Sequence, residues 1–348
     1  MFHMRDLRYL LAYTIPLAAA LGLVWGGAWA WLTPLYVFGA VPLWEGLRTA
    51  GAPAVAEPAT DAPPRSPFFD GLLYLNVALQ YGLMALFLYT VRTQPFAGWE
   101  LAGHVFSFGI CCGALGINVA HELGHRPRRA EQWLAQALLL STLYLHFFIE
   151  HNRGHHRHVA TPLDPATARL HEPFWAFLPR AVWGEYRSAW HLEHERLARQ
   201  EQPALSWHNQ MLRFQLAQAA LVVLVAVAFG PKALLAWLGA ATVGVVLFQL
   251  VNYVEHYGLL RRRTEKGIYE RVQPHHSWNS EHTMGRILLY ELTRHSDHHY
   301  QASRPYHTLR GQPASPQMPT GYPGMMLLAA VPPLWFKVMN KRVPEVAG

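Results

Sequence analysis

The length of its uncharged segments is the feature that most constrains this chain. From Tyr9 to Trp44 the sequence contains no Asp, Glu, Lys or Arg. This run is much longer than the ~20 helical residues that cross the hydrocarbon core of a bilayer. Two short membrane-spanning helices fit it, with a turn near Gly26–Gly27 or Thr33–Pro34. The apolar core of a signal peptide is much shorter, so we expect no processing there.

Further apolar segments bring the expected number of membrane-spanning helices to six. The predicted spans are approximately residues 9–26, 28–44, 71–91, 102–120, 214–230 and 233–254. Two more apolar segments, Trp133–Ile149 and Tyr322–Phe336, are expected to be buried in protein or to lie along the interface, because they contain a histidine or paired prolines. The sequence therefore predicts an all-α polytopic membrane protein with a histidine-rich helical cap, forming one integral-membrane domain over residues 1–348.

The basic residues that flank the spans predict its orientation, because cytoplasmic loops carry an excess of Lys and Arg. Basic residues follow the fourth and sixth predicted spans, whereas the turns 92–100 and 231–232 hold one Arg and one Lys. We therefore expect both termini, a Pro- and Ala-rich linker at 45–70, and the polar segments 121–210 and 256–320 on the cytoplasmic side of the cell inner membrane. The formal net charge of +7 fits a face held against anionic lipid.

Histidine is unusually frequent, with 21 in 348 residues, and three clusters have the spacing of metal ligands. The clusters are His121 with His125, then His151, His155 and His156, then His295, His298 and His299. Helical residues four apart share a face. His155 should therefore lie above His151, with His156 pointing about 100° away, and the third cluster should converge on one face. His256, at the end of the sixth span, is a ninth candidate. Ionisable groups near membrane depth are costly and usually functional, so a shared metal site is predicted.

The type of ligand limits the identity of the metal. A catalytic zinc usually takes three protein ligands, so nine histidines are too many for one zinc. No cysteine lies close to the clusters, which argues against iron–sulfur and copper–thiolate centres. Imidazole suits iron, copper, nickel or zinc, so the pattern predicts two first-row metals without naming them. Glu122, Glu255 and Asp297, inside the motifs, are candidates to orient the imidazole rings.

The strings around these histidines are long and occur in a fixed order. They are NVAHELGH at 118–125, EHNRGHHRHVATP at 150–162, NYVEHYGLL at 252–260, HSWNS at 276–280 and RHSDHH at 294–299. From about residue 70 to 310 the chain resembles the membrane-bound non-haem di-iron alkane 1-monooxygenases. These belong to the three-histidine-box superfamily of fatty-acid desaturases and hydroxylases. Leu163, Thr293 and Tyr300 depart from the residues usual there, but none is a candidate ligand.

The resemblance implies an enzyme that hydroxylates the terminal carbon of n-alkanes to primary alcohols, using dioxygen and two electrons. Acid–base groups cannot cleave such a C–H bond, so the chemistry must come from a cofactor. The family binds two iron ions through nine histidines. Carried over to this sequence, these are His121, His125, His151, His155, His156, His256, His295, His298 and His299.

The family draws its electrons from rubredoxin, which an NADH- or NADPH-dependent rubredoxin reductase reduces. Rubredoxin-type cysteine pairs do not occur in this sequence, so the electron carrier must be a separate protein. Rubredoxins are acidic, which makes two groups of arginines candidates for a docking rim. They are Arg126, Arg128 and Arg129, and Arg261, Arg262 and Arg263. The positive-inside bias explains the same arginines equally simply.

Other readings remain open from the sequence. The nearest is another three-histidine-box enzyme, namely an acyl desaturase, a fatty-acid hydroxylase or a monooxygenase of aromatic methyl groups. A membrane zinc metalloprotease would use His121, Glu122 and His125, but it leaves the other clustered histidines unexplained. A metal transporter would place its ligands near the middle of the membrane, whereas these lie at the ends of predicted spans.

Overall fold

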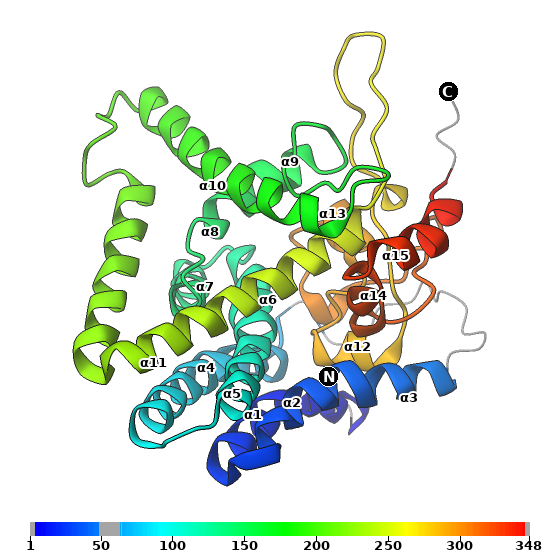
Figure 1. The fold of residues 1–348 in the computed structure, drawn as a ribbon. Helices are drawn as coiled ribbons and strands as arrows, with labels where there is room; N and C mark the ends of the chain where they lie inside the picture. Colours follow the sequence, from blue (N-terminus) through cyan, green and yellow to red (C-terminus); the bar gives the residue numbers. More distant parts are fainter. Residues whose placement is uncertain (1–3, 49–62, 64, 345–348) are drawn as a thin grey trace.

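The computed structural model describes residues 4–48, 63 and 65–344, and these are predominantly helical (Figure 1). The residues described form no β-strand and contain only two isolated β-bridges. The α-helices are α1 (Thr14–Trp25), α2 (Leu32–Leu35), α3 (Val41–Arg48), α4 (Pro67–Thr93), α5 (Gly98–Cys111), α6 (Asn118–Gly124), α7 (Arg129–Ser141), α8 (Phe147–Glu150), α9 (His156–His158), α10 (Phe174–Arg199), α11 (Gln210–His256), α12 (Thr283–Leu288), α13 (His295–Tyr300), α14 (Tyr322–Ala329) and α15 (Pro332–Met339). The predicted all-α class is confirmed.

Shorter 3-10 and π-helical segments connect these helices. The 3-10 segments are η1 (Met4–Tyr13), η2 (Gly27–Trp31), η6 (Pro274–His276), η7 (Tyr306–Thr308) and η8 (Asn340–Arg342). The π-helical segments are η3 (Tyr36–Ala40), η4 (Cys112–Ile117) and η5 (His151–His155). π-helical turns inside α-helices occur frequently at functional sites. Here η4 leads into the first histidine motif and η5 contains the second.

Within the part of the chain that the structure describes, four helices are long and apolar enough to cross a membrane: Met4–Trp25, Pro67–Thr93, Gly98–Gly124 and Gln210–His256. The first three correspond to predicted spans 9–26, 71–91 and 102–120, and the fourth contains both 214–230 and 233–254. The predicted span 28–44 is divided among η2, α2, η3 and α3. Most of the linker expected at 45–70 lies outside the described residues. These apolar helices indicate an integral membrane protein.

The chain reverses direction between α1 and η2 at Gly26–Gly27, one of the two predicted turns. Both glycines have positive φ angles, 65° and 57°, which glycine adopts without steric cost. The backbone N–H of Gly27 donates a hydrogen bond to the Glu100 carboxylate at the start of α5. The turn thus fixes the N-terminal helices against the helix that leads to the first histidine motif.

Helix α11 bends sharply at Gly230–Pro231 and forms the two legs of a V in Figure 1. Gly230 has φ 82° and ψ 173°, a backbone conformation that is essentially restricted to glycine. Beside the bend, the side chains of Val227 and Leu235 are 82% and 68% exposed. Apolar side chains left uncovered along such a long helix are expected to face lipid.

Small residues let α5 and η4 approach the second leg of α11 very closely. A Cβ atom on Gly109 would lie 2.5 Å from Val243, and one on Gly244 would lie 2.6 Å from the Cβ atom of Cys112. Small residues allow this close approach between membrane helices. Both Cys111 and Cys112 are fully buried in this contact. The two helical paths end at His121 and His256, so their packing sets the distance between two histidine motifs.

The two apolar segments that were not predicted to span form short helices packed within the protein. Residues 133–149 lie in α7, a turn and α8. Residues 322–336 divide between α14 and α15, where Tyr322 and Trp335 are buried. Neither forms one long helix, and each has buried residues as well as exposed ones such as Trp133 and Leu334.

Replacing Gly230 by Ala should destabilise the bend, because a Cβ atom disfavours this backbone conformation by about 1–3 kcal/mol. We expect a lower thermal unfolding midpoint for the purified protein in detergent. Gly82→Ala is the control, because a Cβ atom there meets no other atom within 4 Å and alanine favours a helix. An unfolding midpoint of Gly230→Ala equal to that of wild type would contradict this account of the bend.

Candidate metal centre

The structure brings all nine candidate histidines together from four separate parts of the chain. They come from α6 and the residue that follows it, from η5 with α9, from the last residue of α11, and from α13. The nine ring nitrogens form two groups, in each of which the nitrogens lie within 4.8 Å of one another. The groups are His121, His125, His151, His156 and His298, and then His155, His256, His295 and His299.

Ring nitrogens in the five-histidine group face one another at short distances. The Nε2 atoms of His121 and His298 are 2.7 Å apart, and those of His125 and His151 are 3.0 Å apart. His156 closes the group, with its Nε2 atom 3.0 Å from that of His151 and 3.2 Å from that of His298. All five Nε2 atoms therefore point toward one small volume.

The four-histidine group has similar dimensions. The Nε2 atoms of His256 and His295 are 3.1 Å apart, and those of His155 and His299 are 3.2 Å apart. All four side chains are buried. Nitrogen atoms bound about 2.1 Å from one ion lie roughly 3.0 Å apart when the bonds meet at right angles. Both groups have the spacing of ligands that share an ion.

The second motif divides its histidines between the two groups in a way that α-helical geometry did not predict. We expected His155 to lie above His151. Instead His151 lies with His156, while His155 joins the other group. The reason is local: η5 is π-helical, and the backbone N–H of His156 bonds to the carbonyl of His151, five residues earlier. The wider turn brings residues five apart together.

The third motif also differs from the expectation that its histidines converge on one face. His295 and His299, four residues apart in α13, belong to the four-histidine group, whereas His298 points into the five-histidine group. A short helix between the two groups can supply both, because adjacent residues are rotated by about 100°. Helix α13 therefore links the two groups.

Burial favours the neutral form of several of these imidazoles. It lowers the pKa of His125 to about 3. Burial, with the neighbouring imidazoles as a smaller cause, also lowers the pKa of His156, His298 and His299 well below the usual range. Neutral imidazole is the form that binds metal ions, so protons compete weakly for these nitrogens near neutral pH.

Asp164 contacts a candidate ligand directly, although its role did not emerge from the sequence. The Nδ1–H of His155 donates to Asp164 Oδ2 at 3.0 Å, and the hydroxyl of Thr167 donates to the same oxygen at 2.6 Å. This bond leaves the Nε2 lone pair of His155 directed into the four-histidine group. A carboxylate behind a histidine orients the ring and raises its basicity as a ligand. The only sequence signal was that Asp164 follows the second motif closely.

The three carboxylates that were expected to orient the rings differ in their contacts. Glu122 accepts hydrogen bonds from Arg126 and from the backbone N–H of Tyr306. Asp297 accepts from Arg304 at 2.7 Å. Both therefore secure the polypeptide around the site through cations and backbone groups. Glu255 is different, because its Oε2 atom lies 3.2 Å from Nε2 of His295.

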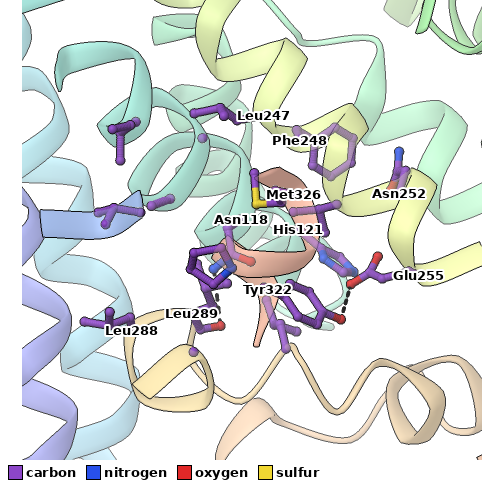
Figure 2. A pocket seen from close by; sticks show the side chains of 18 of the residues that line it. Asn118, His121, Leu247, Phe248, Asn252, Glu255, Leu288, Leu289, Tyr322 and Met326 are labelled. Carbon is purple, nitrogen blue, oxygen red and sulfur yellow. Dashed lines mark hydrogen bonds between the residues drawn. The ribbon is translucent and has the colours of Figure 1, made fainter. Parts of the chain in front are cut away.

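A pocket lined mainly by apolar side chains adjoins the histidines. Figure 2 shows side chains of α11, α12 and α14 around it, with Leu288 and Glu255 at opposite sides of the view. The apolar lining residues are Ile15, Val37, Phe38, Ile110, Leu247, Phe248, Val251, Leu288, Leu289, Leu292 and Met326. The polar lining residues are His121, His151, His295, Asn118, Asn252, Glu255 and Tyr322. An elongated apolar molecule can therefore reach the candidate metal centre.

The candidate docking arginines do not form one exposed surface. Arg126 is buried and pairs with Glu122 at 2.9 Å and Asp70 at 3.3 Å, so its inclusion in a docking rim was wrong. Arg261 is half-buried and donates to the backbone carbonyl of Arg157. The exposed members are Arg128, Arg129, Arg262 and Arg263.

A third group of metal-type side chains, Glu270, His275 and His276, lies outside this centre. The Nδ1 atom of His276 accepts a hydrogen bond from the backbone N–H of Gln273 at 2.9 Å. Neutral His276 must then carry its proton on Nε2, which lies 3.2 Å from Glu270 Oε1. These bonds use both ring nitrogens of His276, and they brace the loop that follows α11.

Replacing Asp164 by Ala should weaken metal binding about 10- to 100-fold, the usual effect of removing a carboxylate behind a ligating histidine. Competition with a chelator measures the change. Glu193→Ala is the matched control, since Glu193 is also buried but pairs with Arg153 and Arg196. Equal metal affinity in Asp164→Ala and wild type would contradict a role for Asp164 in orienting His155.

Comparisons with known proteins agree with this arrangement. The sequence model of the fatty acid desaturase family matches residues 97–326. The alkane 1-monooxygenase of Ectopseudomonas oleovorans is 39% identical over 317 residues, covering 91% of this chain and 79% of that protein. Alkane 1-monooxygenase 2 of Pseudomonas aeruginosa is 38% identical, covering 93% and 86% of the two chains. The hydroxylase component of the Pseudomonas putida xylene/toluene monooxygenase is 30% identical, covering 97% and 89%. The chain therefore belongs to the fatty acid desaturase family and, within it, to the alkane 1-monooxygenases.

Proposed function

We propose that this protein is a di-iron enzyme that hydroxylates the terminal carbon of n-alkanes to primary alcohols. The observation that carries the proposal is that two groups of histidine nitrogens, each sized for one ion, adjoin an apolar pocket. The alkane 1-monooxygenase relatives extend over most of the chain and support the same activity. Neither acid–base nor nucleophilic side chains can attack an unactivated C–H bond, so a metal centre is required.

Iron is the metal that the resemblance to the di-iron alkane 1-monooxygenases implies, and the imidazole donors are compatible with it. Groups of five and four imidazoles exceed the usual three protein ligands of a catalytic zinc. Both cysteines lie buried in the contact of η4 and α5 with α11, so no thiolate belongs to either group. Two bound iron ions would supply dioxygen activation and accept the two electrons. The nine histidines would hold them, and Asp164 would fix the tautomer of His155.

The pocket residues determine which carbon reacts. Leu247, Phe248 and Leu288 provide surfaces without hydrogen-bonding groups, so an alkane is held by shape and by exclusion of water. His121, His151 and His295 belong to the lining, so an alkane that points one end toward them would offer its terminal carbon. A terminal methyl group is therefore presented to the metal centre. Exclusion of water also limits side reactions.

The membrane arrangement that we propose has six spans and places the active site on the cytoplasmic side of the cell inner membrane. The two legs of α11 account for two spans, and residues 28–44 for one more. Arg128, Arg129, Arg262 and Arg263 follow spans and are exposed, which supports the cytoplasmic placement of both termini and of segments 121–210 and 256–320.

Rubredoxin, reduced by an NAD(P)H-dependent rubredoxin reductase, is the electron donor that we propose. The exposed Arg128, Arg129, Arg262 and Arg263 are positive groups that an acidic carrier can recognise. Arg126 is not one of these groups, because its charge is neutralised by Glu122 and Asp70.

A second candidate function is oxidation of a methyl group on an aromatic ring. The 30% identity to the xylene/toluene monooxygenase component supports it. Alkanes remain favoured because several alkane 1-monooxygenases are 38–39% identical to this chain.

Purified protein tests the proposed function directly. We expect two iron ions per chain, and conversion of octane to 1-octanol with rubredoxin, rubredoxin reductase and NADH. His256→Ala should abolish hydroxylation while the protein stays inserted in the membrane. His191→Ala is the control, since this histidine is 71% exposed and outside both groups. One zinc per chain, an alkene formed in an acyl chain, or full activity of His256→Ala would each overturn the proposal.

The pocket predicts how the preferred alkane length can be changed. Leu288→Trp should fill the end of the pocket that lies across from Glu255 in Figure 2, and shift the products of a mixed-alkane reaction toward shorter alcohols. Leu288→Ala should shift them toward longer alcohols. Leu83→Ala is the control, because Leu83 is equally buried but does not line the pocket. An unchanged product distribution in both Leu288 variants would exclude this pocket as the alkane site.

A further inference from the structure

A pocket lined by basic side chains lies where the end of α10 meets the start of α11. Its lining residues are Arg153, Arg196, Trp207, His208, Gln210 and Arg213. Three of these six residues are arginines, and none is acidic. The pocket shares no lining residue with the apolar pocket beside the histidines. It therefore presents positive charge that the proposed hydroxylation does not use.

The arginines of this pocket carry more positive charge than their ion pairs neutralise. The buried carboxylate of Glu193 lies 3.1 Å from Arg153 and 2.7 Å from Arg196. Two guanidinium groups thus share one negative charge. Arg213 is exposed, and within the described residues no carboxylate lies within ion-pair distance of it. The pocket therefore favours an anionic ligand.

The position of Arg213 near the start of α11 strengthens this preference. Its backbone N–H donates to the carbonyl oxygen of Asn209, the residue that caps the helix. The start of a helix carries a partial positive charge, which attracts anions and repels cations. The first turn of α11 contains no Asp or Glu that would offset this charge. An anion in the pocket would be attracted both by the arginines and by the end of the helix.

An apolar face extends from this pocket along the first leg of α11. Leu224 follows Arg213 by eleven residues, about three turns, so the two side chains lie on the same side of the helix. Leu216 and Val227 lie on that side as well, and all three apolar side chains are exposed. Exposed apolar side chains on such a helix are expected to contact lipid acyl chains. The charged pocket and the apolar face match the headgroup and the chains of one phospholipid.

The loop before α11 has the composition of a membrane interface. Trp207 lines the pocket and is 70% exposed, and Leu205, two residues earlier, is 87% exposed. Tryptophan is enriched where lipid headgroups meet acyl chains, because its ring is apolar and its N–H group is polar. These side chains favour a position of the pocket at the level of the headgroups.

We propose that this pocket binds the phosphate headgroup of an anionic phospholipid whose acyl chains lie along the first leg of α11. The inference rests on the proposed function only in placing this end of α11 at the membrane surface. Arg213 provides N–H donors to the phosphate oxygens, and Arg153 and Arg196 provide charge. Arg153 lies between His151 and His155 in η5. A lipid bound here would therefore also contact the segment that carries the second histidine motif.

The variant Arg213→Gln tests this inference, because it removes the exposed charge and keeps both ion pairs of Glu193. Purified protein in detergent is titrated with phosphatidylglycerol that carries a fluorescent acyl chain, and fluorescence anisotropy measures the bound lipid. We expect wild type to bind this lipid more tightly than phosphatidylcholine, with an affinity that falls as salt is raised. Arg213→Gln should bind phosphatidylglycerol about fivefold more weakly, the usual effect of one basic residue near anionic lipid.

Two further variants separate this pocket from general surface charge. Arg187→Gln removes an exposed arginine of α10 that does not line the pocket, and should bind phosphatidylglycerol like wild type. Trp207→Ala should weaken the binding of both lipids, and it gives the answer if Arg213→Gln does not fold. Inorganic phosphate should displace the lipid only weakly, because it lacks acyl chains.

Three results would overturn the inference. The first is wild-type lipid affinity in both Arg213→Gln and Trp207→Ala. The second is complete displacement of the lipid by inorganic phosphate, which would indicate a phosphate site. The third is unchanged lipid binding in Arg213→Gln together with a higher rubredoxin requirement for turnover, which would assign the pocket to the electron carrier. Lipid binding is measured without turnover, so a protein that binds the lipid but holds a single zinc would contradict the proposed function alone.

Discussion

The constraint on which the rest of the structure depends is the close packing of nine imidazoles, seven of them buried, with their nitrogen atoms facing one another. Nε2 atoms only 2.7–3.2 Å apart cannot all donate hydrogen bonds, so several lone pairs meet within each group. Without a cation, the rings lose their hydration on packing together and gain few hydrogen bonds in return. We therefore expect metal binding and folding to be coupled, as in other proteins whose ligands come from distant parts of the chain.

The packing of long helices against one another, rather than any single sequence motif, places the histidines at these distances. Helix α5 continues through η4 to His121, and the second leg of α11 ends at His256, while Gly109 and Gly244 bring the two paths into close contact. The remaining ligands lie on short helices that cover the ends of these paths. Buried ion pairs fasten those short elements, as Arg304 does for α13 through Asp297. A small displacement of either long helix would separate the ligands.

Much of the site was predictable because motif strings and apolar runs are local in sequence. The nine histidines, the turn at Gly26–Gly27 and the break between residues 230 and 233 were all found in this way. The division of the ligands was not, because the i, i+4 rule assumes an α-helix and η5 is π-helical. Asp164 and Tyr322 reach the site only through tertiary packing, and the ion pairs that bury Arg126 join α6 to α4. Contacts of this kind produce no periodic pattern in the sequence.

The boundary between the pocket and the metal centre explains why the two regions differ so strongly in polarity. Apolar walls suit an alkane, whereas a metal centre needs donor atoms in the same buried space. Neutral imidazoles satisfy coordination without adding charge, so they can adjoin leucine and phenylalanine side chains at low desolvation cost. The carboxylates are held apart from the apolar walls, by Arg126 at Glu122 and by Arg304 at Asp297. Glu255 alone among these three lines the pocket, and its charge therefore falls where the substrate meets the metal centre.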